Sequence, residues 1–161
     1  MSYLRFAAMI AVSTVAMFGL MYLNTYTSDH VFFSQTRAWM ALVMGAVMAI
    51  IMLSFMLHMY KNRRANIAIA ATSVAVFVGA LFLVRSQATV DDSAWMKAMI
   101  PHHSIAILTS RRADIRDPRV RQLADRIIEA QLREIAEMKQ LIIDLESRPV
   151  PPDAPELPPG R

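Results

Sequence analysis

Residues 96–103 read Met-Lys-Ala-Met-Ile-Pro-His-His, and they bring two thioethers and two adjacent imidazoles into about two turns of a helix. In that helix, Met99 would share a face with His102 and His103, three and four residues later. The chain has no cysteine, so a soft or borderline metal must be bound through methionine sulfur and histidine nitrogen. This donor set favours copper, and we predict metal ligands at Met96, Met99, His102 and His103.

A second group of candidate ligands lies on the next predicted helix. An apolar seam with alternating steps of three and four runs through Val120, Ala124, Ile127, Gln131, Glu134, Met138, Leu141 and Leu145. Glu134 is a carboxylate in this seam, and burying one is costly unless it is paired, protonated or metal-bound. We therefore add Glu134 and Met138 to the predicted ligands. The alternatives are a salt bridge from Glu134 to Arg111, Arg112 or another arginine of the first helix, or exposure of Glu134 at the end of a narrow core.

Two strings carry a family resemblance. Met-Ile-Pro-His-His at 99–103 and Ile-Ile-Glu-Ala-Gln-Leu-Arg-Glu-Ile-Ala-Glu-Met at 127–138 resemble the signature of the bacterial domain-of-unknown-function family 305, over roughly residues 91–146. The resemblance implies a ferritin-like helical fold in an exported or membrane-anchored protein, and some members of the family bind copper in the periplasm. This chain departs from the family pattern at Ser104, where Gln is frequent, and it lacks a methionine-rich extension after residue 103.

Three apolar segments precede this region, at about residues 3–23, 38–60 and 65–84. Each is near the roughly 20 residues that cross about 30 Å of hydrocarbon. The composition is 55% hydrophobic, which also indicates membrane spans. Arg5 before the first segment is typical of a signal peptide, but residues 21–24 offer no cleavage site of small residues, so we predict a retained span and a membrane domain at 1–85.

Basic residues predict the orientation of the spans. Lys61, Arg63 and Arg64 form the densest basic cluster beside any span, and such clusters stay in the cytoplasm. We therefore predict a bacterial inner-membrane protein with a cytoplasmic N-terminus and with everything after Arg85 outside the cytoplasm. The net charge of +4 comes from the membrane edges, which indicates contact with the lipid bilayer and no nucleic-acid partner.

Residues 86–147 are predicted to form a helical hairpin. Asp91 and Asp92 begin the first helix, Pro101 should kink it, and it should end near Ala113. Asp117 and Pro118 then supply the cap and first residue of the second helix. Six of the eight prolines lie between 149 and 161, so we predict that 148–161 is a disordered, extended tail.

The expected fold class is all-α, with three transmembrane helices followed by this extracytoplasmic hairpin. Because each helix of a pair buries only one stripe, we expect a second copy to complete a ferritin-like four-helix bundle. Small residues at 41, 45 and 49 and at 71, 75 and 79 predict close packing of spans two and three, with Gly45 near Gly79, or alternatively a dimer contact.

Two further patterns have modest interpretations. A methionine ladder occupies positions 40, 44, 48, 52 and 56, and ordinary apolar packing is favoured over a thioether path for Cu(I). Ser28 could cap a helix that starts at Asp29 and leads into span two, which would place Asp29 and His30 near the exit of span three. For His30 a capping or interfacial role is favoured over metal ligation.

Together these observations predict a membrane-anchored, extracytoplasmic protein that binds copper, with Cu(I) favoured, and forms a homodimer. The Glu-x-x-His pattern of di-iron bundles and the sequence motifs of nucleophilic or phosphate-binding enzymes are absent, so we expect no enzymatic activity. The alternative is a structural or assembly module, in which the histidine pair and Glu134 form a buried polar network at a dimer interface.

Overall fold

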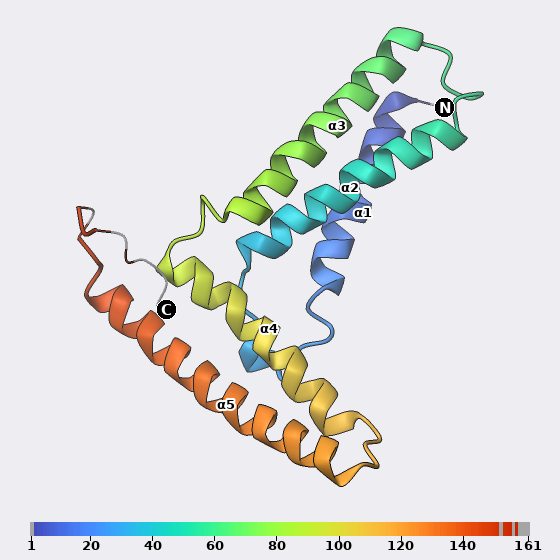
Figure 1. Ribbon diagram of the computed structural model, residues 1–161. Helices are drawn as coiled ribbons and strands as arrows, with labels where there is room; N and C mark the ends of the chain where they lie inside the picture. Colours follow the sequence, from blue (N-terminus) through green and yellow to red (C-terminus); the bar gives the residue numbers. More distant parts are fainter. Residues whose placement is uncertain (1, 152, 156, 158–161) are drawn as a thin grey trace.

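The computed structural model describes residues 2–151, 153–155 and 157, and the helices in this part of the chain confirm the all-α class. Figure 1 shows two groups of helices. The first contains α1 (Tyr3–Leu20), α2 (Gln35–Phe55) and α3 (Arg63–Ser86), and the second contains α4 (Asp92–Arg112) and α5 (Pro118–Ser147). A loop with a short 3-10 helix, η1 (Ser28–His30), joins α1 to α2. The α4–α5 hairpin runs across the end of the first group rather than continuing its direction (Figure 1).

Helices α1, α2 and α3 are long and apolar enough to cross a membrane. They agree with the three predicted spans, although α2 begins at Gln35 because the Ser34 hydroxyl caps it, accepting a hydrogen bond from the Arg37 N–H at 3.2 Å. At one end of the group, the Tyr3 hydroxyl donates to Asn66 Oδ1 at 2.8 Å. The N-terminus and the basic turn at 61–64 therefore lie at the same end, opposite to the hairpin (Figure 1).

The packing of the small residues differs from the prediction. Gly45 is buried, but it faces Thr14 of α1 and not Gly79, which has no other side chain close to the position of an added Cβ. The residues at 71, 75 and 79 are exposed, so this stripe does not form the α2–α3 interface. The reason is that α2 lies between α1 and α3 and presents its smallest residues to α1.

The methionine ladder of α2 takes part in packing at the C-terminal end of the helix. Met52 and Met56 contact the cluster formed by Phe6, Ala49, Leu53 and Tyr60, while Met40 is exposed. A hollow of about 700 Å³ lies between α1, α2 and α3, and it is lined mainly by alanine and aliphatic side chains, together with Tyr3, Phe6 and a few hydroxyl side chains. The ladder residues are not among those that line it, which agrees with the favoured interpretation of ordinary apolar packing.

The hairpin is built as its caps predict. The Asp91 carboxylate accepts from the Ala94 N–H at 2.7 Å, and Asp117 caps α5 with Pro118 as the first helical residue. The seam of α5 agrees with the prediction in part. Ala124 and Met138 are buried and Leu145 packs against the core as predicted, but Ile135 and Ile142 are buried where Glu134 and Leu141 were expected. The expectation that Glu134 lies in the apolar core is therefore wrong.

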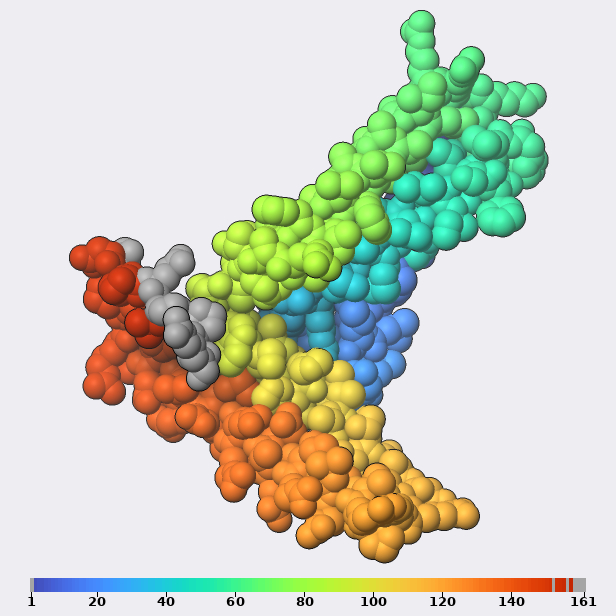
Figure 2. All heavy atoms as spheres, viewed as in Figure 1, coloured from blue at the N-terminus to red at the C-terminus, as the bar shows by residue number. Residues whose placement is uncertain are grey.

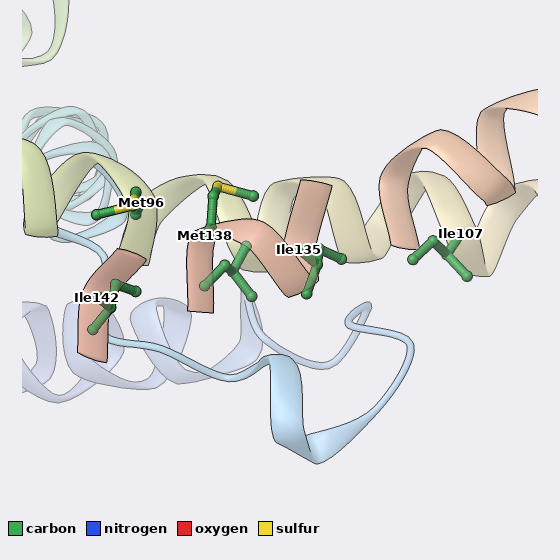
Figure 3. Packing of buried hydrophobic residues seen from close by; sticks show 6 residues of the cluster. Met96, Ile107, Ile135, Met138 and Ile142 are labelled. Atoms are coloured by element: carbon green, nitrogen blue, oxygen red, sulfur yellow. The ribbon is translucent and has the colours of Figure 1, made fainter. Parts of the chain in front are cut away.

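The hydrophobic core of the hairpin lies between α4 and α5 (Figure 3). Its buried members are Met96, Ile100, Ile107, Ile135, Met138 and Ile142. Tyr26 and Phe32 of the α1–α2 loop pack against this cluster. The chain itself thus supplies part of the cover that two helices alone lack.

The α1–α2 loop is fastened to the hairpin by polar contacts centred on Ser104, a fully buried residue of α4. The Ser104 hydroxyl accepts the Tyr26 N–H at 2.7 Å and lies 3.0 Å from Nδ1 of the buried His30. Asp29 forms an ion pair with Lys139 of α5, and the Tyr26 hydroxyl accepts a hydrogen bond from Arg111. We call this set of contacts the clasp.

The clasp corrects the prediction for the loop. Ser28 does not cap a helix that leads into span two, because η1 ends at His30 and α2 starts separately after Ser34. Asp29 and His30 contact α5 and α4 instead of the exit of α3. After α5 ends at Ser147, residues 148–151, 153–155 and 157 contain no helix or strand, and the rest of the predicted disordered tail lies outside the described residues.

Gly45→Ala should destabilise the packing of α1 on α2. A Cβ at this position would overlap the Thr14 hydroxyl and lie 3.2 Å from its methyl carbon, and overpacking of this kind costs about 1–3 kcal/mol. Unfolding in mixed detergent micelles measures the loss. Gly79→Ala is the matched control, because nothing lies within 4 Å of its added Cβ; equal destabilisation by both variants would contradict this packing.

Acidification should weaken the clasp through His30. Burial lowers the pKa of His30 below its usual value, Lys139 lowers it further, and Asp29 opposes the change. The unfolded chain therefore binds this proton first, so stability present above about pH 6.5 is lost progressively as the pH falls toward the folded pKa. Thermal unfolding at pH 7.5 and 5.5 should show a smaller loss for His30→Gln than for the unmodified chain. Both proteins contain His103, so its effect is the same in the two measurements. An identical loss of stability in both would mean that His30 does not contribute to the pH dependence.

Candidate functional site

His103 and Glu134 bring α4 and α5 together at the candidate site. His103 Nδ1 lies 3.0 Å from Glu134 Oε2, so the pair is within ion-pair distance. The angle at which Nδ1 meets the carboxylate does not suit a hydrogen bond. This buried nitrogen therefore has no hydrogen-bond partner among the described residues. Gln131 Nε2 donates to the same Glu134 oxygen at 3.2 Å. The imidazole is 15% exposed and the carboxylate 49%, so the pair lies at the edge of the hairpin core.

The other two ligands predicted close to His103 also lie on α4. His102 is exposed, and its ring centroid is 6.3 Å from that of His103. Met99 is half-buried against the hairpin core, one helical turn before His103. The helical period therefore gives Met99 and His103 a common side of α4, as their spacing predicted.

Met96 and Met138 have a different environment. Both are buried in the apolar core between α4 and α5 (Figure 3), where they contact aliphatic side chains. Met96 also lines a hollow of about 470 Å³ with Asp91, Asp92, Trp95 and Leu141. The structure thus places Met138 in the core and Met96 between the core and a surface hollow. Neither has a described contact with the histidine pair.

Electrostatics favour a neutral imidazole at the site. Burial lowers the pKa of His103 below its usual value, and the neighbouring His102 adds to the lowering, while Glu134 opposes it. A neutral imidazole keeps a lone pair, which is the form that binds a metal ion. Because Nδ1 lies beside the Glu134 carboxylate, Nε2 is the ring nitrogen that is left for a ligand. A carboxylate next to the second ring nitrogen is common for metal-binding histidines.

The site lies on the side of the hairpin that the clasp leaves uncovered. Ser104 and Lys139, which hold the loop, project from one side of the α4–α5 seam, and the helical period directs His103 and Glu134 to the other. We call this second side the open flank. It is formed by Met99, His103 and Ala106 of α4 and by Leu123, Ile127, Ala130, Glu134 and Leu141 of α5.

Chemically, the open flank offers the thioether of Met99, the imidazole of His103 and the carboxylate of Glu134, with the exposed His102 next to it on α4, but not a closed metal site. In the described part of the chain, no group of three or more His, Cys, Asp or Glu residues is arranged to hold a metal ion. The alternative pairing of Glu134 with an arginine is not found among the described residues, where Glu134 contacts His103 and Gln131 and Arg111 donates to Tyr26. The arrangement is an incomplete ligand set at a protein surface.

Sequence reasoning missed the role of Ser104. This residue follows the histidine pair directly, yet it faces the opposite side of the seam and holds the loop. Its position one residue after His103 and three before Ile107 placed it near the seam, and a buried hydroxyl requires a partner. The partner, a loop 74 residues earlier in the chain, could not be identified from spacing.

Comparison with known proteins agrees with this architecture. Residues 81–143, which include α4 and most of α5, match the family described as Domain of unknown function (DUF305). The chain is also 34% identical over 102 residues to the uncharacterized protein L153 of Acanthamoeba polyphaga mimivirus, an alignment that covers 59% of this chain and 67% of the viral protein. The chain belongs to the DUF305 family.

The DUF305 match confirms the family predicted from the two sequence strings. It starts in the last turns of α3 and covers the histidine pair, Glu134 and Met138, so all six predicted ligands lie inside it. No solved structure matches the chain at a significant level.

Proposed function

We propose that this DUF305 protein is a membrane-anchored metal-binding protein that binds copper, preferentially Cu(I), at the open flank of its hairpin. The observation that carries the proposal is the Met99–His102–His103 group beside Glu134, with His103 Nδ1 3.0 Å from the carboxylate. In this proposal Met99, His102 and His103 are ligands, and Glu134 orients His103. The protein has no catalytic role.

The choice of copper follows from the donor atoms. A thioether is a soft ligand and an imidazole is borderline, and together they suit Cu(I) better than Mg²⁺ or Ca²⁺, which prefer oxygen. Met96 and Met138 are secondary candidates because both are buried in the core. Met96 is the better placed of the two, because it lines the hollow beside Asp92 at the end of α4 nearest to α3.

The proposed cellular location follows from the basic residues. Lys61 and Arg63 lie at the end of the membrane helices near Tyr3, and the hairpin lies at the opposite end. If the basic end stays in the cytoplasm, the hairpin is outside it, which in a bacterium would be the periplasmic face of the inner membrane. Because α4 begins six residues after α3 ends, the site would stay close to the lipid surface.

Met99→Leu should weaken Cu(I) binding by tenfold or more, because it removes the sulfur and nearly conserves the volume of the side chain. His103→Ala should have a similar effect. Competition with a chromogenic Cu(I) chelator, in detergent-solubilised protein under anaerobic reducing conditions, measures the affinity. Met40→Leu is the matched control, because Met40 is an exposed methionine on α2, outside the α4–α5 hairpin. Equal affinities for the unmodified protein, the Met99 variant and a His102→Ala/His103→Ala variant would refute the copper site.

The orientation has its own test. A reporter that is active only in the cytoplasm, fused after Arg161, should be inactive, and a reporter that requires export should be active. The reverse result would place the site in the cytoplasm. Replacement of Lys61, Arg63 and Arg64 by Gln is the informative variant, because it removes the charges that should fix the orientation.

A structural or assembly role is the second candidate. It is favoured by the position of the His103–Glu134 pair on a flank that also exposes Leu123 and Leu141. In the single chain Glu134 is half-exposed, so the pair would become buried only on association. If the His102→Ala/His103→Ala variant loses assembly while copper affinity stays at the level of the unmodified protein, this second function takes precedence.

A further inference from the structure

The open flank combines exposed apolar side chains with the candidate metal site. Leu123 is 48% exposed and Leu141 45%, although both lie on the side of α5 next to the seam. On the opposite side of the seam, Tyr26 and Phe32 of the loop cover the core. Helix α5 forms the outer edge of the molecule (Figure 2), and of the described helices only α4 packs against it. The open flank is therefore accessible to a partner.

We infer that a second copy of this chain docks on the open flank about a two-fold axis through the middle of the hairpin, and that the two His103–Glu134 pairs meet there in a shared metal site. The sharing of the metal rests on the proposed copper function, whereas the docking does not. In the membrane, both copies must have the same orientation relative to the bilayer, so the axis is parallel to the membrane normal.

The position of the site along the helices supports this axis. Because the hairpin runs across the ends of the spanning helices (Figure 1), the axis crosses α4 and α5, and each helix meets its counterpart in the antiparallel direction. Residues at mid-length then approach their own copies. His103 lies next to the central residue of the 21-residue α4, and Glu134 lies near the centre of the 30-residue α5. Each His103 would thus have the partner's Glu134 in reach as well as its own.

The apolar residues of α5 repeat the same symmetry. Leu123 and Leu141 lie nine residues before and nine residues after position 132, so an antiparallel α5 pair centred there places each Leu123 against the partner's Leu141. Ala106 of α4 and Ala130 of α5 are small and lie on the open flank near the axis, where they permit close approach. The spacing of the exposed leucines and the position of the small residues thus both fit a two-fold arrangement.

The size of the flank is sufficient for a dimer. A 21-residue helix is about 30 Å long, and two adjacent helices are about 20 Å wide, which gives roughly 600 Å² in projection and more in accessible area. Stable interfaces bury about 800 Å² per partner. A dimer would also double the ligand set, to two thioethers and four imidazoles, and so complete a site that one chain leaves open.

Disulfide trapping tests the docking, and the absence of cysteine makes the unmodified chain a clean background. Two differently tagged full-length chains, one with Leu123→Cys and one with Leu141→Cys, are co-expressed and oxidised in native membranes. We expect a mixed disulfide at about tenfold higher yield than for Leu123→Cys with Ile143→Cys, because residue 143 is exposed on another side of α5 and the geometry of a disulfide is strict.

The single variants separate the possible arrangements. In the antiparallel pair, two copies of residue 123 are 18 residues apart along α5, about 27 Å, so Leu123→Cys alone should not crosslink to itself. Efficient self-crosslinking at 123 would show a parallel arrangement and overturn the axis. Equal yields for the 141 and 143 partners, or no crosslink with either, would overturn the docking.

Copper stoichiometry then tests the sharing. In the trapped dimer, we expect one Cu(I) per two chains, and Glu134→Gln in both chains should lower the affinity by about 10–100-fold while the crosslink yield is retained. One Cu(I) per chain would overturn the shared site and leave the proposed copper function intact. A trapped dimer without Cu(I) binding would instead refute the copper function, and with it the shared site, while the docking stands.

Discussion

An antiparallel pair of helices can bury only one stripe on each helix, and this limit determines how the α4–α5 hairpin is completed. The chain covers one side of the seam with its own α1–α2 loop, which packs Tyr26 and Phe32 on the core and is fastened through Ser104 and the Asp29–Lys139 ion pair. The hairpin is therefore joined to α1, α2 and α3 by the short α3–α4 connection and by the clasp. This arrangement fixes which side of α4 remains available.

The candidate site depends on which side of the α4–α5 seam the loop covers. Adjacent residues on a helix are separated by about 100°, so Ser104 and His103 lie on opposite sides of the seam. Ser104 is fully buried under the loop, whereas His103 lies at an edge beside a half-exposed carboxylate. Burial lowers the pKa of His103, and this favours the neutral imidazole. The neighbouring His102 and Glu134 remain accessible to solvent. Ser104 thus holds the loop, whereas His103, one residue earlier, is available for binding.

Sequence reasoning succeeded where one segment carried its own signal. The caps at Asp91 and Asp117, the three apolar spans and the common side of Met99 and His103 all follow from local spacing. It failed at the α5 seam, where Ile127, Glu134 and Leu141 fit the same period as Ile128, Ile135 and Ile142 one residue later. Two neighbouring stripes with the same spacing cannot be ranked by period alone, because the partner helix selects one of them. The pairing of Gly45 with Gly79 failed for a similar reason, since α1 took the surface assigned to α3.

The sequence by itself determined the helical class, the three apolar spans, the family and the donor atoms of the candidate site, because each depends on residue type and on distances of a few positions along the chain. The tertiary structure decided which of those donors lie together. It moved Glu134 from the core to its edge, kept Met96 and Met138 inside the core, and brought His30 to Ser104 across 74 residues. Contacts over such a separation arise from the packing of whole helices and loops, and no local pattern in the chain specifies them.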